Sequence, residues 1–572
     1  MIPFATGCHH ICIPLVMART SLFDQLRRSI RLAHASERTG RPADEIAEMG
    51  RNHAVSRRNM LRGAAGATAA ALATSALAGC AADESGGGIE GTALGRTRSA
   101  LPRANGNVAI IGAGLAGLSC AYELQKAGLT ATIYEASTRA GGRCYSMGGQ
   151  FAGPVTFPGQ VIERGGELID TAHATMKAYA NEFGLSLYDI GKDPGAVFYR
   201  VGGVTYPESR IVDEYRVLVD AMRDDLRTVG SPTATSFTAT EAALDRMSLR
   251  EYLRTRNAPP VIRAVIDVAY TIEYGLDADQ LSCLSFLLFI HADRRAKFAP
   301  WGVFSDERYH IIGGNQQVAV GLANRLPGQI QYGRMLRKVA KLSDGRIELT
   351  LVEGSTTRTV QHDAVVLAIP FSVLRDVTLD ASLNLPARKL RAINEFHMGT
   401  NSKMMIGFSS RPWVEQGGNG AAYSDMTNHQ TNWETDSINA TSTRGILTDY
   451  SGGARGASLD PAKVQSHAAA FLTDLDKIYP GASKAATRDP RGNILVHLEA
   501  WPKNPLTKGS YSANHLGYFT TICDQEAPPV GNLFFAGEHT SSFYEWQGFM
   551  EGAALSGLRA AGEVSALLAG KK

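Results

Sequence analysis

The sequence predicts a two-domain α/β protein, and three observations support this fold class. The chain has 572 residues, which is more than a single hydrophobic core usually holds. From Asn107 onward, an apolar strand pattern is followed by a glycine-rich turn, a helix pattern and a second strand pattern. From Asn532 onward, another apolar strand pattern leads through a tight turn into a long helix. Both ends of the chain are therefore expected to contribute to the α/β part of the fold.

The first strand–helix–strand unit lies in the segment NVAIIGAGLAGLSCAYELQKAGLTATIYE. Residues 108–111 form a short, continuous apolar run, as a buried parallel strand does. Residues 118–127 follow with a helix pattern, which Gly128 ends. The letters TATIYE then predict a second strand that ends at Glu135.

The glycines between this strand and this helix have the spacing G-x-G-x-x-G. Gly112 permits the tight turn, Gly114 lets the backbone approach a pyrophosphate, and Gly117 lets the helix pack closely on the strand. The helix amino terminus offers free N–H groups to phosphate, and Glu135 is placed to accept hydrogen bonds from ribose hydroxyls. Strand, glycines, helix, strand and acid in this order predict a dinucleotide-binding site.

A second glycine-rich segment follows at once and indicates which dinucleotide is bound. The letters ASTRAGGRCYS contain the pattern R-x-G-G-R, which resembles the signature of glutathione-reductase-type FAD folds in the amine oxidase branch. In this interpretation Arg143 lies near the phosphates as a charge-assisted donor. Further on, VIERGGELID carries the pair Gly165-Gly166 and resembles the segment that passes beside the flavin ring in that family.

The carboxyl-terminal segment NLFFAGEHTSSFYEWQGFMEGAALSGLRAAGEV resembles the second FAD motif of the same family. That family includes monoamine oxidases, polyamine oxidases and lysine-specific histone demethylases. The resemblance implies that Glu538 holds the cofactor and that the backbone of Met550 faces the N1–C2=O edge of the flavin. A helix amino terminus at that edge would stabilise negative charge on the flavin.

Two further segments resemble the middle of this family and suggest how the domains are built. DERYHIIGGNQQVAVGLANRL matches its middle FAD segment, and MLRKVAKL matches its adenine-side strand, with Val339 pairing through its backbone. The resemblance implies a glutathione-reductase-like FAD-binding domain with an interleaved substrate-binding domain. The FAD-binding domain is expected from residues 105–172, 306–385 and 506–570, and the substrate-binding domain from 173–305 and 386–505.

Lys403 stands in the apolar strand pattern SKMMIGF and has two interpretations. A lysine in a buried strand is costly unless it is paired or neutral, so a simple explanation is that Lys403 snorkels at the wet end of the strand. In the amine oxidases, however, a lysine in the matching segment hydrogen-bonds a water at flavin N5. The resemblance therefore implies a catalytic Lys403 beside the flavin, with a lowered pKa that suits it to hold this water.

The segment KGSYSANHLGYF is expected to supply the other side of the substrate site. Covalent monoamine oxidases have a cysteine where this chain has Ser510, and a serine cannot form the thioether, so we expect non-covalent FAD. By the same resemblance, Tyr511 and Phe549 are two catalytic aromatic residues that steer a neutral amine towards the flavin. Trp546 is a candidate for a further wall of the site.

The resemblance implies oxidative deamination of an L-amino acid or a primary amine. A hydride leaves the α-carbon for flavin N5, the imine hydrolyses to a carbonyl compound and ammonia, and O2 reoxidises the flavin and yields hydrogen peroxide. The arginine that venom-type L-amino-acid oxidases use for the substrate carboxylate is absent from Gly165-Gly166-Glu167-Leu168. Arg164 could replace it, or Glu167 could favour a cationic substrate; L-amino acids are slightly preferred here.

Three alternative functions remain open from the sequence. The chain could be a polyamine or other amine dehydrogenase that uses an acceptor other than O2. It could be an FAD oxidase or desaturase of a non-amine substrate, which would have no use for Lys403 and Tyr511 together. It could also be a binding protein like the GDP-dissociation inhibitors, although these lack FAD and the motifs from Gly112 to Glu135 and at Glu538 are intact.

Composition adds mainly exclusions. The formal net charge is +3, so neither nucleic acid nor an anionic surface is indicated as a partner. The hydrophobic share of 44% and the charged share of 20% are ordinary for a globular protein. The seven cysteines show no metal-ligand spacing and no disulfide framework. Nothing in the sequence points to a particular oligomeric state.

The amino-terminal end is expected to be an export signal in residues 1–80. Arg57 and Arg58 precede an Ala-rich apolar stretch that is too short for a good membrane span, and the pair resembles a twin-arginine signal. The letters LAGC resemble a lipoprotein box, with lipid attachment at Cys80 or plain cleavage as the two alternatives. Residues 81–104 are expected to be a flexible linker, Met17 could be the true start, and the protein is expected in the periplasm or on the cell surface.

Overall fold

The computed structural model describes residues 106–190, 194–289, 307–435 and 443–570. All of these residues belong to one compact unit, Arg98–Lys572. The expected export signal at 1–80, Cys80 and the expected linker at 81–104 lie outside the described residues.

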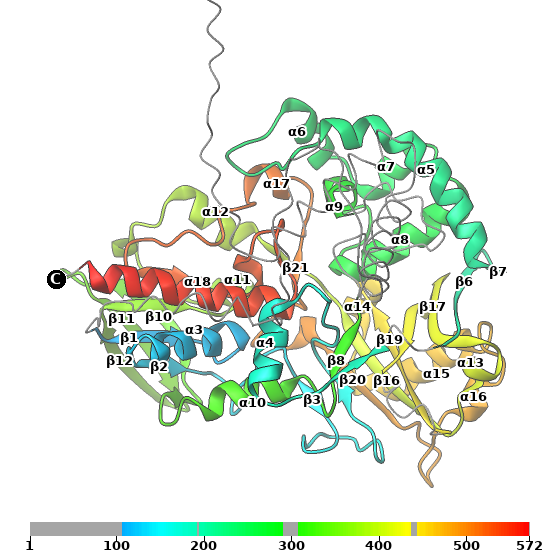
Figure 1. Cartoon of the computed structure of the whole chain (residues 1–572), viewed down its shortest axis with the longest axis horizontal. Coiled ribbons are helices and arrows are strands. Elements are labelled where there is room, and N and C mark those ends of the chain that lie inside the picture. Colours follow the sequence, from blue (N-terminus) through cyan, green and yellow to red (C-terminus); the bar gives the residue numbers. More distant parts are fainter. Residues whose placement is uncertain (1–105, 191–193, 290–306, 436–442, 571–572) are drawn as a thin grey trace, which may run out of the picture. The chain divides into compact units, whose positions relative to one another are not determined.

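A parallel five-stranded sheet forms the centre of the part coloured blue, green and red on the left of Figure 1. Its strands come from the beginning, middle and end of the chain, in the spatial order β22 (Leu533–Phe535), β13 (Ala364–Leu367), β1 (Val108–Ile111), β2 (Ala131–Tyr134) and β9 (Ile330–Gln331). Every neighbouring pair in this sheet is parallel. All residues of β1 and β13 are buried, which explains why β1 is a continuous apolar run in the sequence.

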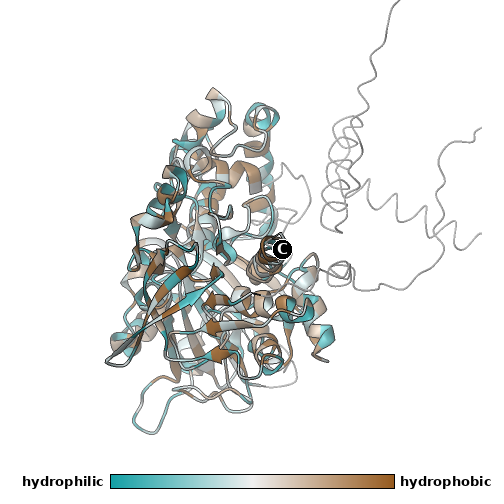
Figure 2. Cartoon of the chain, turned by 90° about the vertical axis from the view of Figure 1, so that its left-hand side faces the viewer, coloured by the Kyte–Doolittle hydropathy of each residue, from teal (hydrophilic) through white to brown (hydrophobic). Residues whose placement is uncertain are grey.

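Helices cover this sheet, and two of them pack closely together. α3 (Leu115–Lys126) follows β1, α10 (Gln316–Asn324) follows the middle glycine pair, and α18 (Met550–Ala569) ends the described chain. α18 packs along α3, and Figure 2 views α18 along its axis from its carboxyl-terminal end. Helix α3 begins at Leu115, three residues before the start predicted from the sequence. Gly117 consequently lies within the first turn of this helix.

A second sheet, of four strands, lies beside the first in the same part of the fold (Figure 1). Its order is β12 (Thr356–His362), β11 (Ile347–Glu353), β10 (Met335–Lys341) and β14 (Thr378–Leu379). The β10–β11–β12 strands are antiparallel, and β10 pairs with β14 in parallel.

A seven-stranded sheet forms the second large part of the fold, at the lower right of Figure 1. Its order is β20 (Val496–Ala500), β16 (Ser402–Phe408), β19 (Gly445–Ser451), β18 (His429–Glu434), β17 (Gly418–Met426), β6 (Ala196–Val201) and β7 (Val204–Tyr206). β16 has neighbours on both sides, and all seven of its residues are buried. Lys403 is therefore held inside a sheet and does not snorkel at a wet strand end.

Helices between residues 208 and 289 lie above this sheet in Figure 1. They are α5 (Glu208–Thr228), α6 (Ala239–Asp245), α7 (Leu249–Thr255), α8 (Pro260–Tyr274) and α9 (Cys283–Phe289). α8 has proline at its first position and ends at Gly275, whose φ of 66° is the left-handed conformation that favours glycine. α8 packs against β17 and β18, so its carboxyl-terminal end reaches the sheet that carries Lys403.

The remaining short elements connect these layers. Three two-stranded pairs are β3 (Ser146–Met147) with β4 (Ile162–Glu163), β5 (Leu187–Asp189) with β8 (Tyr309–Ile311), and β15 (His397–Met398) with β21 (Ser512–Ala513). The other helices are α4 (Ala174–Glu182), α11 (Phe371–Leu374), α12 (Ala387–Glu395), α13 (Pro412–Glu415), α14 (Gly453–Ser458), α15 (Val464–Leu475), α16 (Ala482–Ala485) and α17 (Tyr518–Thr521).

The five-stranded sheet draws its strands from residues 105–172, 306–385 and 506–570, and the seven-stranded sheet draws its own from 173–305 and 386–505. Figure 2 shows apolar segments in the strands and helices of both parts. Across the described ranges, no helix is both long and apolar enough to cross a membrane. Cys120, Cys144, Cys283 and Cys523 are free and buried.

Candidate active site

The turn between β1 and α3 has the shape that a bound pyrophosphate requires. Gly112 has a φ of 103°, which an L side chain rarely adopts. A Cβ atom on Gly117 would lie 1.9 Å from the Gly112 carbonyl oxygen, so only glycine lets α3 start this close to β1. A Cβ atom on Gly114 would meet nothing within 4 Å, and the backbone there borders open space. The three glycines and the amino terminus of α3 therefore fit a dinucleotide phosphate.

Glu135 follows β2 and lies beside the same turn. One of its carboxylate oxygens accepts the N–H of Ala113 at 2.7 Å, and the other accepts the N–H of Ser137 at 2.8 Å. A carboxylate has about four acceptor positions, so Glu135 keeps acceptor capacity for ribose hydroxyls. The structure thus brings Glu135 to Gly112, Gly114 and Gly117, as predicted for one nucleotide site.

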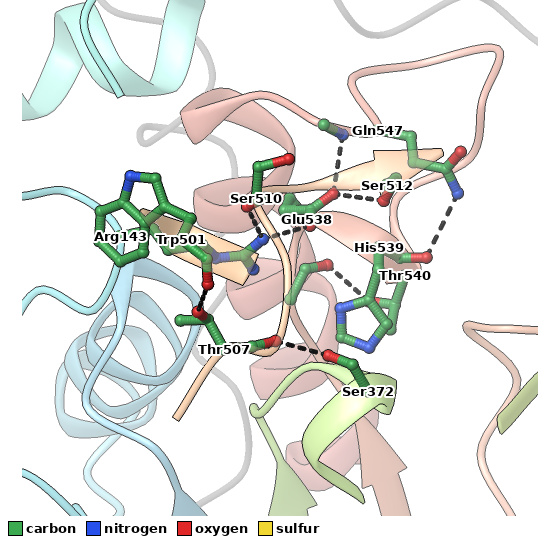
Figure 3. Close-up of polar contacts among 12 residues, drawn as sticks. Arg143, Ser372, Trp501, Thr507, Ser510, Ser512, Glu538, His539, Thr540 and Gln547 are labelled. Carbon is green, nitrogen blue, oxygen red and sulfur yellow. Dashed lines mark hydrogen bonds and ion pairs between the residues drawn. The ribbon is translucent and has the colours of Figure 1, made fainter. Parts of the chain in front are cut away.

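Arg143 and Glu538 form an ion pair that joins the two ends of the chain (Figure 3). Arg143 Nη1 donates to Glu538 Oε1 at 2.8 Å and to the Ser510 carbonyl oxygen at 2.7 Å. Glu538 Oε2 accepts from the Ser512 hydroxyl at 2.5 Å and from the Gly548 N–H at 2.9 Å. This network fixes the loop that leads into α18 against the segment that follows the first glycine turn.

The pair Gly165-Gly166 lies between Arg143 and Met550. A Cβ atom on Gly165 would lie 1.7 Å from the Arg143 carbonyl oxygen, and one on Gly166 would lie 2.8 Å from Met550 Cγ. Met550 is the first residue of α18, and the preceding Phe549 makes no side-chain capping bond. Gly165, Gly166, Arg143, Glu538 and Met550 therefore converge on one place, at the free amino terminus of a long helix.

Lys403 reaches this convergence from the other part of the fold. Its side chain is 5% exposed, and its Nζ donates to the carbonyl oxygens of Glu163 and Gly165 at 2.9 Å each. The same Nζ donates to Glu167 Oε2 at 2.6 Å. An ammonium group has three N–H donors, so these contacts use all of them. Glu167 Oε1 also accepts from Trp433 Nε1 at 3.0 Å.

Tyr511 and Phe549 lie in two different aromatic groups. The Tyr511 hydroxyl is 2.8 Å from the Tyr450 hydroxyl and donates to the Ile272 carbonyl oxygen at 3.1 Å. Phe549 instead packs against Trp546 and against His173, with ring centroids 5.6 and 5.3 Å apart. The two predicted residues come from adjoining segments, since a Cβ atom on Gly548 would lie 3.8 Å from Tyr511.

The structure does not bring Val339 to the nucleotide site. Its side chain is fully buried, and its carbonyl oxygen accepts the Asp380 N–H at 2.9 Å within the four-stranded sheet. The backbone that lies against Glu135 is that of Arg334, whose N–H donates to the Glu135 carbonyl oxygen at 2.8 Å. Val339 follows Arg334 by five residues, about 16 Å along a strand. An adenine contact is therefore better placed near the start of β10.

The comparisons with known proteins agree with this arrangement. The profile of the family described as flavin containing amine oxidoreductase matches residues 115–565. The chain belongs to this family.

Its relatives differ in the amines on which they act, as their names state. The flavin-dependent L-tryptophan oxidase RebO of Lentzea aerocolonigenes is 26% identical and covers 82% of this chain and 99% of its own. An L-amino-acid oxidase of Siganus canaliculatus is 24% identical over 82% of this chain and 88% of its own. Cyclohexylamine oxidase from Brevibacterium oxydans IH-35A shares the fold, with a TM-score of 0.67 and 22% identity over 81% of this chain and 99% of its own.

The amine oxidoreductase is thus an enzyme with an α/β fold and FAD as its cofactor. The glycine cradle at Gly114 fits the pyrophosphate of such a cofactor, and the uncapped amino terminus of α18 fits its flavin. The individual roles of Lys403, Tyr511 and Phe549 stay predictions.

Sequence reasoning missed three residues of the site in this oxidoreductase. Tyr450 and Trp433 lie on β19 and β18, and Tyr450 is the cross-strand neighbour of Lys403. Their rings are 5.1 Å apart. Glu273 lies in the last turn of α8, directly after the Ile272 carbonyl that Tyr511 binds. No sequence spacing points to these residues, because strand register and helix packing bring them to Lys403 and Tyr511.

Two carboxyl groups near the site have raised pKa values. Burial raises the pKa of Glu163 to about 8, although the Asn315 N–H and the Ser146 hydroxyl both donate to it. Burial and the nearby charge of Asp170 raise the pKa of Glu273 to about 8. Both groups therefore keep a proton over part of the neutral range unless a cation is bound beside them.

Proposed function

We propose that this enzyme oxidatively deaminates an amine, passes the electrons to O2, and releases ammonia and hydrogen peroxide. The observation that carries this proposal is the contact between Lys403 and the glycine pair. Lys403 comes from the seven-stranded sheet, yet its Nζ bonds the carbonyl oxygens of Glu163 and Gly165 at the convergence with Met550. The substrate-side sheet and the cofactor-side segment thus meet at a buried positive charge.

When it is bound, FAD accepts a hydride from the carbon that carries the amino group and hands the electrons on. The residues of this chain hold the cofactor in place for that reaction. The turn at Gly112–Gly117 would hold the pyrophosphate, Glu135 would accept from the ribose, and the amino terminus of α18 would stabilise negative charge on the flavin.

The cofactor is held without a covalent bond at Ser510. A hydroxyl cannot form the thioether that a cysteine forms, and the Ser510 hydroxyl already donates to Asn401 Oδ1 at 2.6 Å. Asn401 directly precedes β16, so this hydrogen bond connects the Ser510–Tyr511 segment to the start of the strand that carries Lys403. Arg143 holds the same segment through the Ser510 carbonyl oxygen.

Lys403 acts as a fixed ammonium group, paired with Glu167 at 2.6 Å, beside the reacting centre. Its three N–H donors already have protein partners, so it would have to release one of them to hold a water molecule. A fixed charge stabilises negative charge that develops next to it, and a buried site makes that effect larger. Tyr511, held at its hydroxyl by Ile272, supplies an aromatic face for the amine.

A peroxide-coupled assay tests this function on the purified, FAD-loaded protein. The panel comprises the twenty L-amino acids, simple primary amines and diamines. We expect peroxide and ammonia in equal amounts from a defined subset. Bleaching of the flavin absorbance by the panel without oxygen, but no peroxide with it, would indicate an amine dehydrogenase. A yellow protein that none of these compounds bleaches would refute an amine substrate.

We further propose that the protein is exported by the twin-arginine route and attached to the membrane through Cys80. The support is the Arg57-Arg58 pair, the apolar stretch that follows it, and the letters LAGC. Replacing both arginines by lysine should leave the enzyme in the cytoplasm, as cell fractionation would reveal. Cys80→Ser should release the exported enzyme from the membrane fraction, and unchanged membrane attachment of that variant would exclude lipidation.

A further inference from the structure

The carboxyl group of Glu273 is only partly exposed, and it has no hydrogen-bond or ion-pair partner among the residues that the structure describes. Surrounding protein raises its pKa to about 8, while part of its side chain remains accessible to a ligand. No hydrogen bond or ion pair to the Glu273 side chain is present in the part of the chain that the structure describes. Burying a carboxylate without such partners is costly, so its presence requires a physical explanation.

The surroundings of Glu273 make a negative charge more costly. It stands in the last turn of α8, where the helix dipole is negative. The charge of Asp170 opposes its ionisation further. A cation placed beside the carboxylate would lower the cost of ionising Glu273, whereas a neutral or anionic group would not.

Glu273 also belongs to the place where the substrate is expected. The preceding carbonyl, that of Ile272, accepts from the Tyr511 hydroxyl at 3.1 Å and from the Asn401 side-chain amide at 2.5 Å. Asn401 is two residues before Lys403 on the same segment. The Ile272 carbonyl of α8 thus connects the backbone beside Glu273 to Tyr511 directly, and to Ser510 through Asn401.

The cations around the glycine pair are already engaged. Lys403 is paired with Glu167 at 2.6 Å, and Arg164 is paired with Glu499 at 2.6 Å. Arg164 also stacks on the ring of Tyr145 at 3.9 Å. Neither cation is placed to neutralise Glu273, and a substrate α-carboxylate would have to compete with an existing carboxylate for either one.

We propose that Glu273 binds a second cationic group of the substrate, so that the enzyme acts on amines that carry two positive charges, such as diamines and polyamines. This inference rests on the proposed amine oxidation. One amino group reacts beside Tyr511, and the distant ammonium donates to the Glu273 carboxylate. An L-amino acid with an uncharged side chain brings no second cation to Glu273 and is therefore disfavoured.

The test compares α,ω-diaminoalkanes of three to eight carbons with n-alkylamines of equal length. For the wild type we expect a lower KM for the diamines. Glu273→Gln should raise the diamine KM by roughly 10- to 100-fold, the effect of losing one charge-assisted hydrogen bond, while the alkylamine KM changes little. Asp267→Asn is the matched control, because Asp267 lies on the same helix but is paired with Arg250 at the surface.

A second variant distinguishes direct binding from a structural effect. Glu273→Asp keeps the charge and withdraws it by one methylene, so the preferred diamine should become longer by about one carbon. A merely structural role would lower activity for all chain lengths alike. Thermal stabilisation of the FAD-loaded protein by each diamine gives a readout that needs no turnover, and Glu273→Gln should abolish most of it.

Two results would overturn the inference and leave amine oxidation standing. One is a wild type that prefers alkylamines or L-amino acids. The other is a diamine preference that survives Glu273→Gln unchanged, both in KM and in thermal stabilisation. If no amine bleaches the flavin and no diamine raises the melting temperature, the proposed function itself fails together with the inference.

Discussion

Replacing Lys403 by methionine should destabilise the protein through the charge that it leaves behind. Lys403 and Glu167 are 5% and 6% exposed, and their charged atoms are 2.6 Å apart. In Lys403→Met, the Glu167 carboxylate keeps only the Trp433 N–H at 3.0 Å. Removing one partner of a buried ion pair costs about 3–5 kcal/mol. The carbonyl oxygens of Glu163 and Gly165 lose their donor as well.

This cost converts to a measurable change in melting temperature. The compact unit Arg98–Lys572 has about 475 residues (572 − 98 + 1). With roughly 2 cal/mol/K of unfolding entropy per residue, its total is about 1 kcal/mol/K. The melting temperature should therefore fall by roughly 3–5 °C, as followed by circular dichroism or by release of FAD fluorescence.

The double variant Lys403→Met, Glu167→Gln should recover most of this loss, because no unpaired charge remains buried. Arg391→Met is a control for the loss of an exposed cation, since Arg391 and Glu395 are both 52% exposed and such pairs contribute about 0–1 kcal/mol. The reasoning is refuted if Lys403→Met melts no lower than this control, or if the double variant melts no higher than Lys403→Met. If the double variant regains stability but its activity stays low, the lost activity reflects the chemical role of Lys403.

Three further predictions test the cofactor site and the buried carboxyl. Gly114→Val should fold but lose its visible flavin absorbance, because its side chain enters the phosphate space. Gly117→Ala should fail to fold at all, since a Cβ atom there clashes with backbone at 1.9 Å. A Gly114→Val that retains the flavin content of the wild type, or a soluble and folded Gly117→Ala, would contradict this. Arg143→Met should leave the Glu538 carboxylate without its ion pair at 2.8 Å and weaken FAD retention in dialysis, while Arg143→Lys should restore part of it. Glu273→Gln should be more heat-stable than the wild type at high pH. The unfolded carboxyl loses its proton near 4.5, and the folded one near 8. Wild-type stability is therefore lost as pH rises through that window, by at most about 5 kcal/mol. A melting difference between the two proteins that does not grow from about pH 5 to pH 9 would show that Glu273 is not a buried, partnerless acid.

The sequence by itself determined the parts of this protein that depend on short spacings. The turn at Gly112–Gly117 requires glycine for conformation and for close approach, and Glu135 follows at the end of the next strand. Such requirements act on neighbouring residues, so they are visible in the letters alone. The long helix that contains Met550 was also expected from the sequence, and it starts at that residue.

The tertiary structure alone decided what each buried charge contacts. Lys403 and Glu167 are 236 residues apart, and Tyr511 and Ile272 are 239 apart. These pairs depend on the register of the seven-stranded sheet and on where α8 packs against it, which no single-sequence spacing encodes. The same limit explains why Glu273 was missed. Neighbouring residues set the local conformation of the chain. Contacts between residues far apart in the sequence depend instead on how strands align in a sheet and on how helices pack against it.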